Sequence, residues 1–142
     1  MEDHLAAQRM RFVLVGDGEF RSSLEGSIAG FRIQDRVTLA GWRKDVGDCL
    51  AAFDMFVMPS KLEGLCTSLI DAQAVGLPCV ATRAGGMVDI VSDMENGCLA
   101  EPRNSESLAG AILRLASNEA LRDRFREAGP KVVEERFTAK VM

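Results

Sequence analysis

The sequence has little of the chemistry that metal-binding proteins use. Its 142 residues include one histidine, His4, and four cysteines without a Cys-x-x-Cys pair. Because structural zinc sites are built from clustered cysteine and histidine ligands, no such site is expected. We expect the cysteines to be reduced thiols that serve as small core residues. They are Cys49, Cys66, Cys79 and Cys98.

A positive net charge and long apolar runs are also lacking. The formal net charge of −4 and the isoelectric point near 5.1 argue against affinity for nucleic-acid backbones or anionic membrane surfaces. Runs such as FVLV and MFVM are too short to span a bilayer, and MEDHLAAQRM is too acidic and polar for a signal peptide. These absences predict a cytoplasmic protein with no transmembrane segment and no nucleic-acid partner.

The segments that are present alternate between strand-like and helix-like patterns. This alternation predicts one α/β domain over residues 1–142, with a Rossmann-like parallel sheet, helices on both faces and C-terminal helices. The expected strands are 11–18, 36–42, 55–60, 78–82 and 97–101, of which 55–60 should be a buried strand. The expected helices are 19–32, 45–53, 65–76, a short one after residue 86, 105–117 and 118–137.

Two of the expected helices carry specific predictions. In helix 65–76, the core stripe should be formed by Leu65, Leu69, Ala72 and Gly76. At ~100° per residue this places Asp71 about 200° round from Leu69, on the solvent side. Pro130 should break or kink the last helix unless it begins a new one.

The loops that follow the strands are the expected place for function. In an open parallel sheet, ligands bind outside the carboxyl ends of the strands. Here those loops include VGDG (15–18), SKLEG (60–64) and RAGGM (83–87), and the last two lead into expected helix starts that suit a phosphate. Glu63 would repel a purely anionic ligand but would accept hydrogen bonds from hydroxyls. A sugar diphosphate satisfies both conditions.

The order of these motifs resembles one family. The segment PSKLEGLCTSLIDAQAVGLPCVATRAGGMVDIV is similar to the E-x7-E segment, the A-x-G-x-P-V-V-A strand entry and the GG-x-x-E turn of the large group 1 (family 4) of retaining GT-B glycosyltransferases. VGDG, AGW-x-x-DV and ENGCLAEP match in the same order. The resemblance runs from about Phe12 to Phe137 and implies the C-terminal, donor-binding half of a GT-B fold.

The resemblance also implies a donor site. Glu63 falls on the first glutamate, the catalytic-site carboxylate that contacts donor-sugar hydroxyls, and Asp71 falls on the second, which holds the ribose hydroxyls. A solvated helix carboxylate is the alternative for Asp71. The remaining donor-binding positions are the backbone amides of Gly64, Leu65 and Cys66, the turn at Gly85 and Gly86, the strand end at Gly16, Lys61, and the pair Arg43 and Lys44 beside the base. For that pair a solvated basic surface is the alternative.

Several departures from the family bear on this site. Asp71 is one methylene shorter than glutamate, and Asp89 likewise replaces a glutamate. The family's first strand, whose loop supplies an arginine and a lysine to the diphosphate, has no counterpart here, and neither has the acceptor-binding lobe. The domain is therefore expected to be N-terminally incomplete, with Lys61 or Arg83 as candidates to replace the lost positive charge.

The implied parent enzyme transfers a hexose from a UDP, GDP or ADP sugar to an acceptor hydroxyl, with retention at the anomeric carbon and without a cofactor or metal. Its N-terminal lobe would be a partner and would provide any peripheral membrane attachment. This chain alone is expected to bind donor weakly without turnover, and an exposed sheet edge is expected to favour dimers.

Two alternatives remain open. One is a sugar-nucleotide epimerase or a phosphorylase-type protein, because fold alone does not distinguish these from a transferase. The other is a non-catalytic nucleotide-binding module. VLVGDG is similar to the acidic strand end of receiver domains, but the later aspartate and lysine of that class are missing.

Overall fold

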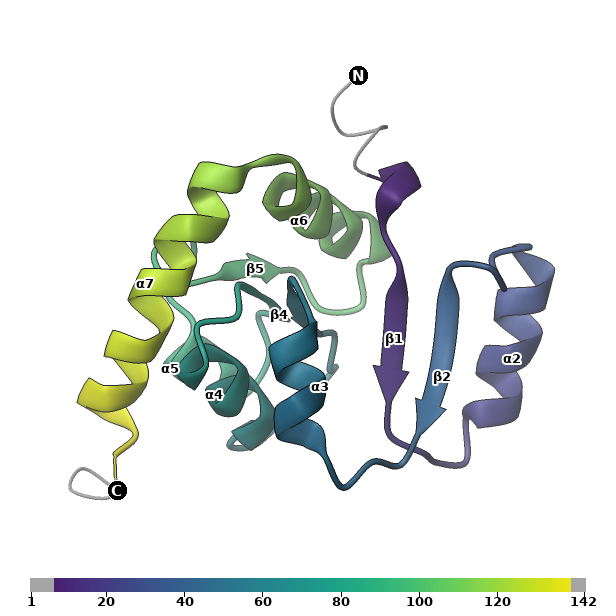
Figure 1. Cartoon of the computed structure of the whole chain (residues 1–142), viewed down its shortest axis with the longest axis horizontal. Coiled ribbons are helices and arrows are strands. Elements are labelled where there is room, and N and C mark those ends of the chain that lie inside the picture. Colours follow the sequence, from purple (N-terminus) through teal and green to yellow (C-terminus); the bar gives the residue numbers. More distant parts are fainter. Residues whose placement is uncertain (1–6, 139–142) are drawn as a thin grey trace.

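The computed structural model describes residues 7–138 as alternating strands and helices (Figure 1). His4 lies outside the described residues. The strands are β1 (Phe12–Val15), β2 (Val37–Gly41), β3 (Phe56–Met58), β4 (Cys79–Thr82) and β5 (Cys98–Ala100). The helices are α2 (Arg21–Gly30), α3 (Val46–Ala52), α4 (Thr67–Ala74), α5 (Met87–Ile90), α6 (Ser105–Ser117) and α7 (Glu119–Arg136). The expected α/β class is confirmed.

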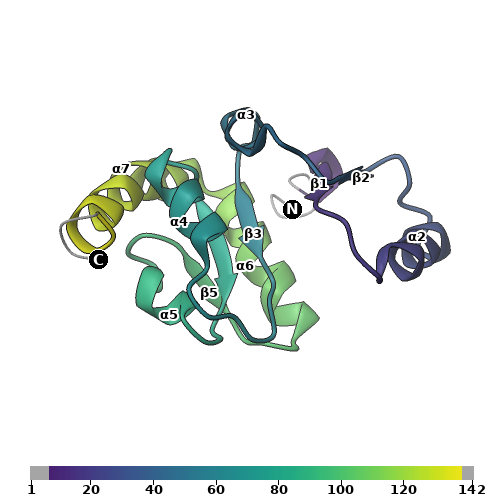
Figure 2. The ribbon, with the colours of Figure 1, turned by 90° about the horizontal axis from the view of Figure 1, so that it is seen from below.

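The strands form two parallel sheets. β1 pairs with β2, and β3, β4 and β5 form a second sheet in that order. Phe56 lies opposite Cys79, and Val80 lies opposite Cys98. Figures 1 and 2 show β1, α2 and β2 standing to one side of the other elements. We call residues 12–41 the N-terminal unit and residues 46–136 the C-terminal body.

Helices cover both faces of the three-stranded sheet. Successive residues of β4 alternate between two buried clusters, because side chains of a strand point to opposite faces. Cys79 and Ala81 join the cluster under α4 and α5, whereas Val80 joins the cluster formed with α6 and α7. Helices α4 and α7 also contact each other, so the C-terminal body is closed around the β4 strand.

The N-terminal unit buries much less. Every buried side chain of the described residues lies at Leu50 or beyond. In β1 all four side chains are apolar and between 37% and 43% exposed, and α2 has no buried residue. The unit is tied to the rest through Met10, which packs against the cluster under α6, and through the chain that continues into α3.

Several expectations about packing were wrong. The helix expected from residue 65 begins at Thr67, so Leu65 lies in the preceding loop with 51% exposure, and Cys66, which is 4% exposed, takes the core position. Strand β3 is half-buried rather than buried, because it pairs only with β4 and its other edge has no strand in the described residues.

The expected break at Pro130 was also wrong, because α7 continues through it. A proline removes the hydrogen bond to the carbonyl four residues earlier, which here belongs to Arg126. That carbonyl lies beside Gly76: a Cβ placed on Gly76 would meet it at 3.2 Å. The preceding Gly129 packs on the backbone of Gln73. Helix α7 therefore runs uninterrupted past its proline, with this stretch packed closely on the backbone at the end of α4.

Candidate functional site

The candidate site begins in the loop that joins β3 to α4. Glu63 is half-buried in this loop, and in the described residues its carboxylate makes no hydrogen bond or ion pair. The loop is held at its start by Thr82, at the carboxyl end of β4, whose hydroxyl donates to the carbonyl of Ser60. The loop therefore follows the carboxyl end of β3 and lies beside that of β4, the edge of a parallel sheet where ligands bind.

The glycine turn after β4 packs directly on this loop. The Gly86 N–H donates to the Glu63 carbonyl at 3.0 Å. A Cβ on Gly85 would lie 1.9 Å from the Glu63 carbonyl oxygen, and one on Gly86 would lie 2.3 Å from that of Gly64. Gly85 also has a φ of +52°, a conformation that L side chains rarely adopt. No residue with a side chain fits here, so the structure brings Glu63, Gly64, Gly85 and Gly86 together.

The start of α4 offers unpaired donors beside Glu63. The N–H groups of Gly64, Leu65 and Cys66 make no hydrogen bond within the described part of the chain. The first helical amides that bond backward, those of Leu69 and Ile70, both reach the Cys66 carbonyl. Free N–H groups and the positive end of the helix dipole favour an anion at this position. A half-buried carboxylate beside an anion-binding helix start is suited to a ligand that carries both hydroxyls and phosphates.

The thiol at the helix start is not a nucleophile in this setting. Burial raises the pKa of Cys66, the negative charge of Glu63 raises it further, and the amides of Leu69 and Ser68 oppose both effects. Burial also raises the pKa of Cys79 far above the usual range of a thiol. A thiol that stays protonated reacts slowly, so these residues fill space, as expected for core cysteines. Cys98 is buried as well, whereas Cys49 is only half-buried.

Asp71 lies on the opposite face of α4 from the core. It is exposed, while Leu69 and Ala72 are fully buried, as the helical spacing predicted. The rotation of α4 is set by a buried amide pair: the side chain of Gln73 donates to the Asn96 carbonyl at 3.1 Å, and Asn96 donates back to the Gln73 side chain at 3.2 Å. This pairing keeps Asp71 directed to solvent.

The basic residues proposed for the site are not brought to it by direct contacts. Arg43 bonds through two nitrogens to Asp45, which holds the pKa of that carboxyl below its usual range. In the described residues no hydrogen bond or ion pair joins Gly16, Arg43 or Lys44 to the loop of Glu63. Lys61 lies exposed on that loop, two positions before Glu63.

The structure disfavours Arg83 as a phosphate ligand. Its guanidinium is 3.3 Å from a Glu101 carboxylate oxygen and 3.4 Å from one of Asp93, so two carboxylates already oppose its charge. Of the two candidates for the lost positive charge, Lys61 is the one without an ion pair in the described part of the chain.

Sequence patterns did not single out Thr82, Gln73 or Asn96. The amide pair has no short-range signal because its members are 23 residues apart and meet only in the folded core. Thr82 had one available signal: it stands at the carboxyl end of a strand whose other residues are apolar, where a hydroxyl needs a partner.

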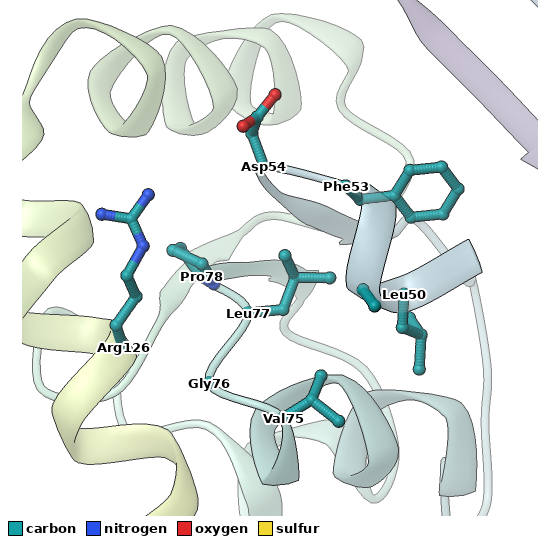
Figure 3. A pocket seen from close by; sticks show the side chains of 9 residues that line it. Leu50, Phe53, Asp54, Val75, Gly76, Leu77, Pro78 and Arg126 are labelled. Atoms are coloured by element: carbon teal, nitrogen blue, oxygen red, sulfur yellow. The ribbon is translucent and has the colours of Figure 1, made fainter. Parts of the chain in front are cut away.

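A separate pocket of about 380 Å³ lies at the other end of α4. Figure 3 shows Arg126 on one side of it and Asp54 on another. Its lining comes from Leu50, Ala51, Phe53, Asp54, Val75, Gly76, Leu77, Pro78 and Arg126. None of the predicted site residues lines this pocket, because Val75 and Gly76 follow the C-terminal end of α4, whereas the site surrounds its first turn.

Comparison with known proteins identifies the family. Residues 1–118 match the family model described as Glycosyl transferases group 1. This chain belongs to that family. It is 32% identical over 123 residues to the UDP-Gal:alpha-D-GlcNAc-diphosphoundecaprenol alpha-1,3-galactosyltransferase of Escherichia coli, a match that covers 86% of this chain and 32% of that protein. The chain spans about a third of the length of this protein and of two other curated relatives, and less of some others.

Similar solved structures confirm the fold. The Anabaena protein Alr3699/HepE in complex with UDP superposes on 96% of this chain, with a TM-score of 0.87 and 27% identity, and this chain covers 40% of it. The C-terminal domain of LpcC from Francisella tularensis superposes with a TM-score of 0.79 at 18% identity. The chain therefore has the fold of the C-terminal half of a GT-B protein. No helix in residues 7–138 is both long enough and apolar enough to cross a membrane.

Proposed function

We propose that this chain is the donor-binding half of a retaining hexosyltransferase, with a nucleoside diphosphate sugar as its donor. The observation that carries the proposal is the half-buried Glu63 beside the three free N–H groups of Gly64, Leu65 and Cys66. Membership of group 1 supports glycosyl transfer, and the UDP complex of the similar Anabaena protein supports a uridine diphosphate donor.

Each group has a separate role in this proposal. The free N–H groups hold the diphosphate and stabilise the negative charge that develops as it leaves, because they are already oriented before the reaction. Glu63 accepts hydrogen bonds from the donor sugar, and Asp71 accepts them from the ribose. The bond between the anomeric carbon and the phosphate oxygen breaks, and its electron pair leaves with the diphosphate. A bond to the acceptor oxygen forms on the same face of the sugar, and the proton of the acceptor hydroxyl passes to the departing diphosphate.

The proposal also covers the positive charge near the diphosphate, the residues beside the base, and the second lobe that binds the acceptor. Lys61 adds a positive charge near the diphosphate, and Gly16, Arg43 and Lys44 border the base. No divalent metal takes part. The acceptor is bound by a second, N-terminal lobe of a cytoplasmic protein, so residues 1–142 alone bind donor without turnover. The free edge of β1 favours association between copies at high concentration.

An amide NMR titration with UDP, GDP and ADP tests the site. We expect shifts concentrated at residues 64–71, 85 and 86, largest with UDP and unchanged by a metal chelator. Glu63→Gln should weaken binding of UDP-glucose while leaving UDP affinity unchanged, and Asp71→Asn should weaken both. Glu127→Gln, an exposed carboxylate change on α7, is the matched control. Shifts spread over α6 and α7, or equal effects from the control, would contradict the proposal.

A further inference from the structure

The pocket of about 380 Å³ lies where two helices end. Ala51 belongs to the last turn of α3, Val75 follows the last residue of α4, and Arg126 reaches the pocket from α7. Figure 3 shows the side chains of Asp54 and Arg126 on different sides of it. Small-molecule sites have volumes of about 300–1,000 Å³. The pocket is therefore large enough for a small organic molecule.

Most of the wall of this pocket is apolar. Its lining residues all have apolar side chains, except for Gly76, Asp54 and Arg126. Leu50 and Leu77 belong to the buried cluster under α4 and α5, so the core fixes their part of the wall. Val75, in contrast, is 59% exposed and leaves apolar surface in contact with water. An occupant with an apolar body would remove that surface from water, which is favourable.

The polar groups of the pocket are mainly hydrogen-bond acceptors that lack a donor. Within residues 7–138, no group donates to the backbone carbonyls of Ala51, Val75 or Gly76. These residues end α3 or follow α4, and the last carbonyls of a helix have no partner inside the helix. The carboxylate of Asp54 likewise makes no hydrogen bond or ion pair with the described residues. A ligand that carries hydrogen-bond donors would satisfy these acceptors.

Arg126 is the only lining residue with a side-chain donor, and its charge is already offset. Its Nη1 atom lies 2.5 Å from a carboxylate oxygen of Asp123, on the same helix. The backbone of Arg126 adds a further acceptor, because Pro130 has no N–H to donate to its carbonyl and that carbonyl lies close to Gly76. The C-terminal end of α4 also carries a partial negative charge. Together these groups favour a positively charged ligand.

We infer that this pocket binds a small organic cation, a primary ammonium group on an apolar chain or ring. An ammonium group has three donors and no acceptor, which matches the carboxylate of Asp54 and the free carbonyls. The apolar body of the ligand covers Val75 and Leu77. The pocket lies at the opposite end of α4 from Glu63, so this inference stands or fails independently of the proposed function.

The test is an amide NMR titration of the full chain with three probes that have the same alkyl length. Hexylamine is protonated at about pH 7 and carries the ammonium group, hexanol is neutral, and hexanoate carries the opposite charge. We expect hexylamine to shift the amides of residues 50–54 and 75–77. The other two probes should bind at least about tenfold more weakly, because neither supplies a charged donor.

Three variants identify the groups that hold the ammonium. Asp54→Asn should weaken hexylamine binding at least about tenfold, whereas Asp48→Asn, which changes an exposed carboxylate of α3 outside the pocket, should leave it unchanged. Arg126→Gln should bind hexylamine at least as tightly as the original chain, because it removes a positive charge. Unchanged amide shifts in α6 confirm that each variant is folded. Equal binding of the three probes, equal losses in the two carboxylate variants, or weaker binding in Arg126→Gln would overturn the inference.

Discussion

The N-terminal unit and the C-terminal body are built from the same kinds of element but differ in what those elements bury. β1 and β4 are both four-residue strands, apolar throughout in β1 and at three of four positions in β4, yet β4 is fully buried and β1 is exposed along its whole length. The difference arises from neighbours rather than composition, since β4 has a paired strand on each side and helices on both faces. The apolar composition of a strand indicates that it can be buried. Whether the strand contributes to the stability of the fold depends on the strands and helices that pack against it.

The largest expected contrast between the two parts comes from truncating one phenylalanine in each. Phe125→Ala should destabilise the protein by about 3–5 kcal/mol, because the side chain is 1% exposed and its loss leaves a cavity. Phe12→Ala should change stability by about 1 kcal/mol or less, because that ring is already 38% exposed. Urea unfolding followed by circular dichroism measures both. Equal losses would show that β1 is as well packed as the body.

A pair of glycine substitutions should give effects of opposite sign. Gly85→Ala should destabilise by more than about 1–3 kcal/mol, the usual range for a left-handed non-glycine residue, because the new Cβ also meets the Glu63 carbonyl. UDP binding should be lost with it. Gly26→Ala in α2 should stabilise by about 0.5–1 kcal/mol, since nothing lies near its Cβ. Thermal melts and UDP titrations distinguish the two. Binding that survives in Gly85→Ala would remove the glycine turn from the proposed site.

Helix caps provide a third, smaller contrast. Helix α7 is capped by Asn118, whose side chain accepts from the Leu121 N–H at 2.9 Å, whereas α2 begins after Phe20 with no side-chain cap. We expect Asn118→Ala to lower stability by about 1 kcal/mol and Phe20→Asn to raise it by up to about 1 kcal/mol. Both effects are measured as shifts in melting temperature. No change in either variant would show that neither helix start limits stability.

The smallest expected effect is a pH dependence confined to the body. Burial holds the pKa of Cys79 above its ordinary value of 9.0, so the thiol stays protonated in the folded chain and ionises more readily in the unfolded chain. Stability is therefore complete below the unfolded pKa and falls as the pH rises above it, by about 0.8 kcal/mol per thiol between roughly pH 7 and 9.5. Cys79→Ala should remove its share of the decline, measured by urea unfolding at both pH values. An identical slope in the variant would contradict this origin.

Sequence patterns predicted the elements well where local chemistry decides them. Gly76, with a φ of +75°, ends α4 as expected, and Asp71 lies on the solvent side that its spacing indicated. The loop of Glu63 was predicted as a ligand site from Glu63 and its neighbours, and its contacts with a ligand stay predictions. The glycines were informative because a Cβ at Gly85 or Gly86 would clash with the backbone of Glu63 or Gly64, so only glycine fits at these positions.

The predictions that were wrong depended on contacts distant in sequence. Pro130 was expected to interrupt α7, but the helix continues through it, where Gly129 packs against α4. Leu65 was expected in the core, but the helix starts two residues later. A single continuous sheet was expected, and the structure contains two. None of these outcomes has a signature within a short window, because each is decided by which partner the segment meets.

The buried pair of Gln73 and Asn96 has a consequence for how the site can vary during evolution. Because this pair holds α4 in one orientation, the helix presents the same exposed positions, Thr67, Ser68 and Asp71, whatever side chains they carry. Substitutions there alter the surface offered to a ligand without disturbing the residues underneath. If the proposed function holds, donor preference can therefore diverge among descendants of this chain while the scaffold is inherited unchanged.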